Sequence, residues 1–327
     1  MDCLYKQSLI EIDEHRFLLT DLRKLATVLP TFHRRPPREL TVGQFLEDHI
    51  NLWFDIFSLL DLKSQLGLLF TCSSFNNNLS ITNLSDIEQK YFNMLTNDIL
   101  RLDIFKYVTK LQANNKITNV SFMKNLKKLD AYGNCGIDQN GIVGLDLVEL
   151  DAGYNNKITN VSFMTNLKKL DASDNSGIDQ NGINGLNLVE LDACGNDKIT
   201  NVSFMKNLKI LHADSTSGID QNGIKGLDLV QLNAGYNNKI INVSFMKNLK
   251  KLFAWSKCCG IDQNGINGLD LVELYVGDNN KITNVSFMTS LKILYAHDNC
   301  GIGQHGIIGL DLVELNVDHN NKIIRCI

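Results

Sequence analysis

The sequence predicts an α/β solenoid of about 11 short repeats of 20–22 residues, with a parallel β-sheet on its concave face, preceded by a small all-α domain. A block beginning KITNVSFM recurs every 41 or 42 residues from Lys116 onward. All three prolines lie within the first 37 residues, whereas the first asparagine comes only after residue 50. These observations predict a helical extension over 1–40, a helical domain over 41–95 and the solenoid over 96–327.

Composition and charge exclude several classes of protein. Apolar residues are 44% and charged residues 21% of the 327 residues, which is typical of a folded chain. The net charge is −4 and no basic tract occurs, so we expect no nucleic-acid partner. The apolar runs are too short to span a bilayer, and the charged N-terminus has no secretory pattern. Eight cysteines without a Cys-x-x-Cys pair favour a reduced, cytoplasmic protein.

Each long block contains two half-repeats that share the pattern L-x-x-L-x-A-x-x-N. The second Leu and the Ala alternate with polar residues, which is the period of a short β-strand with one buried face. A single unit cannot bury its apolar face alone, whereas stacked units share one core. The predicted strands centre on Leu111, Leu129, Leu150, Leu170, Leu191, Leu211, Leu232, Leu252, Leu274, Leu294 and Leu315.

The return segments alternate between NVSFM, whose Val, Phe and Met we expect to fill the convex side, and GIDQNGI, which is rich in turn formers. Leu252 and Leu274 are 22 residues apart, so we expect a local bulge near Lys257. An asparagine five residues after the second Leu is expected to be buried and to bond the backbone of neighbouring turns. The members of this set are Asn134, Asn155, Asn175, Asn196, Asn237, Asn279, Asn299 and Asn320.

This pattern resembles the leucine-rich repeat superfamily, nearest to its shortest repeat types, over about residues 105–327. The resemblance implies a rigid curved scaffold whose concave sheet binds another protein.

The segment before the repeats resembles the F-box, a helical module of roughly fifty residues. The match is I-F-S-L-L-D-x-K-S-x-L followed by T-C-S-x-F-x-x-x-L, starting at Ile56. The resemblance implies an Skp-type adaptor of a cullin-RING ubiquitin ligase as partner. Its expected contact residues are Ile56, Leu59, Leu60, Leu66 and Leu69. The alternative is a helical cap that shields the first repeat, which solenoids need in any case.

No catalytic or cofactor-binding motif emerges from the sequence. The seven histidines have no metal-ligand spacing, and no Gly-rich phosphate loop or nucleophile–base pair follows from the repeat register. The repeated D-Q-N-G segment lacks the terminal glutamate of a calcium loop and is interpreted as a turn. We therefore expect a protein that is no enzyme and uses no metal or cofactor.

The residues beside each strand leucine differ from repeat to repeat. These positions face away from the core, so packing alone does not determine which side chains occupy them. Directly after the Leu, four aspartates come first, at Asp130, Asp151, Asp171 and Asp192, and aromatic residues follow in later repeats. Exposed aromatic side chains on a rigid sheet are typical of binding hot spots. The predicted target-binding residues are His212, Asp214, Phe253, Trp255, Tyr275, Tyr295 and His297.

The whole arrangement resembles F-box/leucine-rich-repeat proteins encoded by large DNA viruses of amoebae. That resemblance implies a substrate-recognition subunit of an SCF-type ubiquitin ligase, acting in the host cytoplasm. A repeat scaffold with a helical cap and no link to ubiquitin is the alternative. The strand at Leu315 has no following repeat, so we also predict weak self-association through this edge.

Overall fold

The computed structural model describes residues 64–65, 80–85, 87 and 89–324. The chain divides into two compact units, Met1–Ile81 and Thr82–Ile327. Nearly all described residues belong to the second unit, which is a parallel β-solenoid. The expected extension over 1–40 and the five expected adaptor contacts lie outside the described residues.

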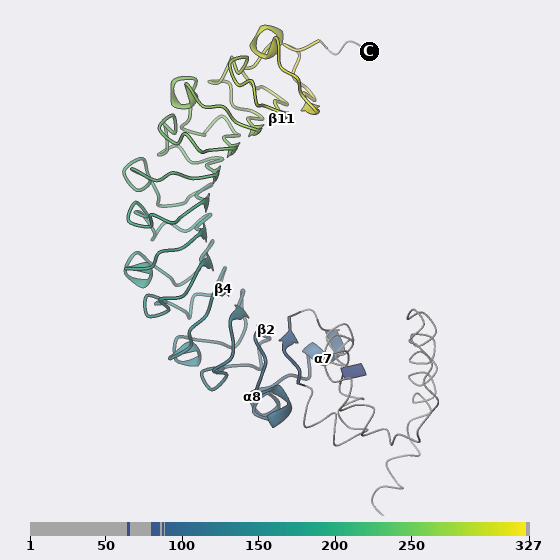
Figure 1. Cartoon of the computed structure of the whole chain (residues 1–327), viewed down its shortest axis with the longest axis vertical. Helices are drawn as coiled ribbons and strands as arrows, with labels where there is room; N and C mark the ends of the chain where they lie inside the picture. The colour runs from purple at the N-terminus through teal and green to yellow at the C-terminus, as the bar shows by residue number, and fades with distance from the viewer. Residues whose placement is uncertain (1–63, 66–79, 86, 88, 325–327) are drawn as a thin grey trace, which may run out of the picture. The chain divides into compact units, whose positions relative to one another are not determined.

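Twelve parallel strands follow one another in chain order and form a single sheet. Figure 1 shows them along the inner side of the curved solenoid. The eleven predicted strands are all present, and β1 precedes them within the range expected to be helical. The strands are β1 (Asn83–Leu84), β2 (Lys110–Gln112), β3 (Lys128–Asp130), β4 (Glu149–Asp151), β5 (Lys169–Asp171), β6 (Glu190–Asp192), β7 (Ile210–His212), β8 (Gln231–Asn233), β9 (Lys251–Phe253), β10 (Glu273–Tyr275), β11 (Ile293–Tyr295) and β12 (Glu314–Asn316).

The strand leucines pair with one another across the whole sheet. Leu129, for example, is in register with Leu111 on one side and Leu150 on the other. Because side chains alternate along a strand, this register turns the leucines toward the core and their two neighbours toward the concave face. The leucines from Leu111 to Leu294 are buried, as are the alanines or valines two residues later. The predicted inward pattern is thus confirmed.

The return segments are turns and short 3-10 helices rather than α-helices. The two α-helices among the described residues of this unit, α7 (Gln89–Phe92) and α8 (Asn97–Leu100), precede the regular repeats. Beyond Leu100, the described chain contains only the 3-10 helices η1 (Asp103–Phe105), η2 (Asn140–Ile142), η3 (Asn181–Ile183), η4 (Asn264–Ile266) and η5 (Gln304–Ile307). A turn of 20–22 residues leaves too little chain for an α-helix, so the α/β expectation is wrong for these segments. None of the described helices is long and apolar enough to cross a membrane.

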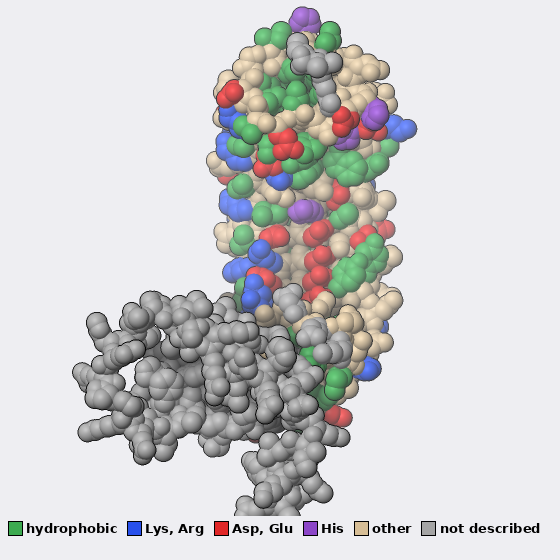
Figure 2. All heavy atoms as spheres, turned by 90° about the vertical axis from the view of Figure 1, so that its right-hand side faces the viewer, with side chains coloured by type: hydrophobic (Ala, Val, Ile, Leu, Met, Phe, Trp, Pro, Cys, Tyr) green, Lys and Arg blue, Asp and Glu red, His purple; other side chains and the backbone are tan. Residues whose placement is uncertain are grey.

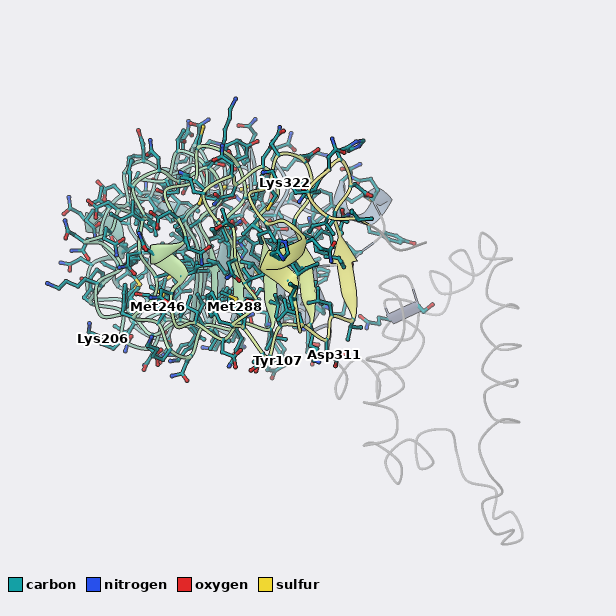
Figure 3. All side chains as sticks on the ribbon, turned by 90° about the horizontal axis from the view of Figure 1, so that it is seen from above. Tyr107, Lys206, Met246, Met288, Asp311 and Lys322 are labelled. Atoms are coloured by element: carbon teal, nitrogen blue, oxygen red, sulfur yellow. The ribbon has the colours of Figure 1, made fainter. Side chains whose placement is uncertain are left out.

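The convex NVSFM segment buries only part of the set that we expected. Met246 and Met288, which Figure 3 labels, are fully buried, and so are the valines. The phenylalanines lie at the surface, with Phe163 41% exposed. The amide of Met164 donates to the carbonyl of Val161 in a tight turn, which directs the intervening side chains outward. The prediction that Phe fills the convex side is therefore wrong.

The asparagine set also divides into two classes. Asn237 is buried, and its Nδ2 donates to the carbonyl oxygens of Ala213 at 2.6 Å and Ile219 at 3.1 Å. Asn155, Asn196, Asn279 and Asn320 make the corresponding bonds. Asn134, Asn175 and Asn299, by contrast, are exposed. In those repeats a smaller side chain one residue later is buried instead, at Cys135, Ser176 and Cys300. The expectation of burial is wrong for these three asparagines.

The D-Q-N-G segments form turns that also join neighbouring repeats. Asp138 Oδ1 accepts a hydrogen bond from the amide of Gly141 at 3.0 Å, which closes the turn. The Gln139 carboxamide pairs with the backbone of Asn160, accepting at 2.8 Å and donating at 2.9 Å. This glutamine therefore acts as a bridge between successive blocks.

The additional residue before Leu274 is absorbed in a turn and leaves the sheet undisturbed. Ser256 adopts a positive φ of 83°, and Lys257 is exposed beside it. Strand β9 keeps its register with both neighbours. The irregularity near Lys257 is thus present, but it lies outside the strand.

The final strand is less covered than the others. Leu315 is 38% exposed, whereas Leu294 on the preceding strand is fully buried. Self-association through this edge stays a prediction.

Candidate protein-interaction surface on the concave sheet

Three rows of side chains cross the concave face at right angles to the strands. The flanking row is formed by the residue before each strand leucine. The central row is formed by the residue directly after it, and a rim row lies two residues further on. The central row runs Asp130, Asp151, Asp171, Asp192, His212, Asn233, Phe253, Tyr275, Tyr295 and Asn316.

The flanking row neutralises most of its own charge. Lys128 pairs with Glu149 at 2.7 Å, and Lys169 pairs with Glu190 at 2.8 Å. A third pair joins Lys251 to Glu273 at 2.7 Å. Such partly exposed pairs contribute little stability each, so this row sets the local charge pattern rather than the strength of the fold.

The acidic part of the central row lies in a groove of about 390 Å³ between β2 and β7. Figure 2 shows the corresponding column of acidic side chains on this face. The pKa of Asp151 is raised to about 6, chiefly by burial and also by the charges of Asp171, Asp130 and Asp192, against a lowering hydrogen bond from the Gly153 amide. Burial likewise raises the pKa of Asp192 to about 6. The fold thus holds carboxylates that are short of compensating charge.

The raised pKa values in the central row predict that the free energy of unfolding falls as the pH rises. The pKa of Asp151 is near 6 in the folded chain and near 3.8 when unperturbed, so its contribution is complete below about pH 4 and is lost as the pH rises through 6. We expect the unfolding free energy to fall by roughly 1 kcal/mol per such group between pH 4 and 7, after allowing for solvent screening. Urea titrations at several pH values measure this, and Asp151→Asn should flatten the profile. An unchanged profile in that variant would contradict the assignment.

The aromatic part of the central row is a continuous stack. The ring centroids of Phe253 and Tyr275 are 4.3 Å apart with an interplanar angle of 16°. Tyr275 and Tyr295 follow at 4.8 Å and 27°. The three rings are half-buried rather than fully exposed, because each covers part of the next. Lys251 Nζ lies 5.2 Å and 5.4 Å from the centroids of Phe253 and Tyr275.

Trp255 and His297 bend over glycines in the turns that follow the preceding strands β8 and β10. A Cβ at Gly235 would lie 2.4 Å from Trp255 Nε1, and one at Gly277 would lie 2.2 Å from the His297 ring. Glycine is therefore required at both positions for these rings to lie along the sheet. His297 Nδ1 also contacts Asp298 Oδ2 at 2.6 Å. Both predicted residues are half-buried on the rim row.

His212 and Asp214 lie where the acidic part ends. His212 is half-buried, with its Nδ1 at 4.0 Å from Asp192 Oδ2. Asp214 is only 8% exposed and lies beneath the surface, and its predicted role in target binding stays a prediction. Its Oδ1 has no hydrogen-bond partner within the described part of the chain.

Three tyrosines at the rim were not among the predicted residues. Tyr132 and Tyr154 meet edge to face at 5.5 Å, and Tyr236 meets Trp255 in the same way at 4.7 Å. Tyr154 and Tyr236 have positive φ values of 56° and 58° in the turn after the strand. The G-Y-N triplet at Tyr154 and Tyr236, and its reordered form Y-G-N at Tyr132, was the available signal.

No family model matches the chain, and no curated protein matches it. Among the described residues, no group of three or more His, Cys, Asp or Glu side chains is placed to hold a metal ion.

Proposed function

We propose that this chain is a leucine-rich repeat protein that binds a target protein on its concave sheet. The stack of Phe253, Tyr275 and Tyr295 carries the proposal. These rings diverge from an otherwise repetitive sequence, and they are held in place by one another before any partner arrives. Rigid aromatic side chains at the centre of a surface are the usual hot spots of protein interfaces. No catalytic role for the chain is part of the proposal.

The second part of the proposal concerns the N-terminal segment. Its F-box-like pattern, with Ile56, Leu59, Leu60, Leu66 and Leu69, would dock an Skp-type adaptor. The chain would then present its target to a cullin-RING ubiquitin ligase in the cytoplasm, which is the host cytoplasm if the chain is viral. Catalysis would belong to the partner subunits. The support is the sequence pattern alone, since these residues lie outside the described part.

The competing proposal is an interaction scaffold with a plain helical cap. The observation that favours it is that most positions of the repeat serve to stack one half-repeat on the next. The two proposals share the concave surface and differ in adaptor binding.

The experiment uses the full chain and a purified Skp-type adaptor. Leu60→Asp should abolish adaptor binding, because a carboxylate cannot be buried at an apolar interface without a partner. Calorimetry measures the binding, and circular dichroism checks that the repeats stay folded. Ile308→Asp is the matched control, since Ile308 is 59% exposed on the solenoid and should leave adaptor binding unchanged. If the wild-type chain binds no adaptor at micromolar concentration, the adaptor proposal is wrong and the scaffold proposal is retained.

A further inference from the structure

Among the described residues, the four central-row aspartates face one basic group within 4.0 Å, the His212 ring beside Asp192. Each accepts a hydrogen bond from a backbone amide two residues later, at 2.9–3.1 Å. Within the described part, no lysine or arginine forms an ion pair with them, and Lys128 and Lys169 are engaged with glutamates. The spacing between strands is about 4.8 Å, so the row places four carboxylates over roughly 14 Å.

A fifth carboxylate, Asp214, lies beneath the surface beside the end of this row. Asp214 is 92% buried, as its 8% exposed fraction shows, and its Oδ1 has no partner in the described structure. Its charge is close enough to raise the pKa of Asp192, the last aspartate of the row. The Cys194 side chain hydrogen-bonds to the Asp214 carboxylate, and Asp214 is not among the residues that line the groove, so it adds negative charge beneath the surface rather than a contact for a ligand.

The aromatic stack continues the same row beyond the acidic groove. Two of its hydroxyl groups are held in place, since Tyr275 donates to Glu273 at 3.2 Å and Tyr295 donates to Glu314. The rings are thus fixed and offer apolar edges rather than charge. A ligand that follows the row would meet anions first and aromatic rings afterwards.

We infer that the concave face binds an extended basic polypeptide segment that runs along the central row, across the strands, with an aromatic side chain on the Phe253–Tyr295 stack. This inference rests on the proposed function, because it takes the concave face as the target-binding surface. The acidic row supplies charge complementarity, which the buried charge of Asp214 reinforces, and the stack selects a polypeptide over a simple polyamine.

The geometry also specifies the spacing of the segment. From Asp130 to Tyr295 the row crosses eight strand spacings, or roughly 38 Å, which an extended chain of about 12 residues covers. Alternate residues of an extended chain lie about 6.6 Å apart on one face, so three basic residues at alternate positions span the four aspartates. Asp192 and Phe253 are three strands apart, or about 14 Å, so the aromatic residue follows the last basic one by about four positions.

The test is a fluorescence anisotropy titration of the full chain with labelled dodecapeptides. The probe has arginine at positions one, three and five, phenylalanine at position nine, and serine or glycine elsewhere. A peptide with the reverse order covers the opposite chain direction, and a scrambled peptide has the same composition without the spacing. We expect one of the two ordered peptides to bind more than about tenfold more tightly than the scrambled one. Added NaCl should weaken this binding.

Matched variants locate the binding on the chain. Asp171→Asn and Tyr275→Leu should each weaken binding of the preferred peptide by about tenfold or more. Asp197→Asn removes an exposed aspartate outside the groove, and Tyr107→Leu removes a tyrosine outside the stack. Both controls should bind the peptide as the wild-type chain does.

Equal binding of ordered and scrambled peptides would overturn the inference, as would binding that Asp171→Asn and Asp197→Asn reduce equally. Displacement of the peptide by millimolar Mg²⁺ or Ca²⁺ at constant ionic strength would also overturn it, in favour of a cation site. The proposed function can still hold after these failures. It holds if a target protein that was identified through the adaptor complex no longer binds the Tyr275→Leu variant. If that target binds Tyr275→Leu as well as the wild-type chain, the proposed function fails instead.

Discussion

Replacing Asn237 with alanine is expected to lower the unfolding free energy by about 3 kcal/mol or more, because several buried backbone groups lose their partner. The Asn237 side chain donates to the carbonyls of Ala213 and Ile219 and accepts from the amide of Lys239 at 2.8 Å. No other described group replaces these bonds, since the position is only 1% exposed. Urea unfolding followed by circular dichroism measures the change.

Asn175→Ala is the matched control for this prediction. Asn175 occupies the corresponding position of the repeat motif but is exposed, so its replacement should change the free energy by less than about 0.5 kcal/mol. Equal losses in both variants would mean that the asparagine matters through the local turn and not through the bonds between repeats.

Gly182→Ala is expected to destabilise the solenoid by about 3 kcal/mol, at the upper end of the usual overpacking range. A Cβ at this position would lie 2.2 Å from the carbonyl oxygen of Thr159, which belongs to the backbone of the preceding half-repeat. The Gly182 carbonyl also accepts from the amide of Val161 at 2.9 Å, so the two segments cannot separate without losing this bond. Thermal and urea unfolding measure the loss.

Gly303→Ala tests whether the destabilisation by Gly182→Ala comes only from the close approach of the new Cβ to the Thr159 carbonyl. Gly303 has an ordinary φ of −113°, and its nearest neighbour to an added Cβ is Lys322 Cβ at 3.4 Å. The substitution should therefore be within about 0.5 kcal/mol of neutral. A large loss at Gly303 would indicate that alanine is poorly tolerated in these turns for another reason.

Much of the candidate surface was predictable, because the repeat register alone brings side chains together. Phe253, Tyr275 and Tyr295 each follow a strand leucine, so in-register pairing makes them neighbours, as observed. The same argument placed the four aspartates side by side. The adaptor contacts around Leu60 remain a prediction, since they lie outside the described residues.

Other features depend on groups that are distant in sequence. The bending of Trp255 requires glycine at position 235, twenty residues earlier, and periodicity does not encode that relation. The phenylalanines of NVSFM are as apolar as the buried methionines, yet a tight turn directs them outward. Composition therefore could not separate the two.

The sequence by itself determined the solenoid, the parallel strands and the order of side chains along the concave rows, because a strict repeat requires every unit to bury the same face against its neighbours. The tertiary structure decided which asparagines are buried, that Asp214 lies beneath the surface, and how far the aspartates are removed from water. These properties depend on packing and solvent access around each side chain, which differ between repeats of nearly the same sequence.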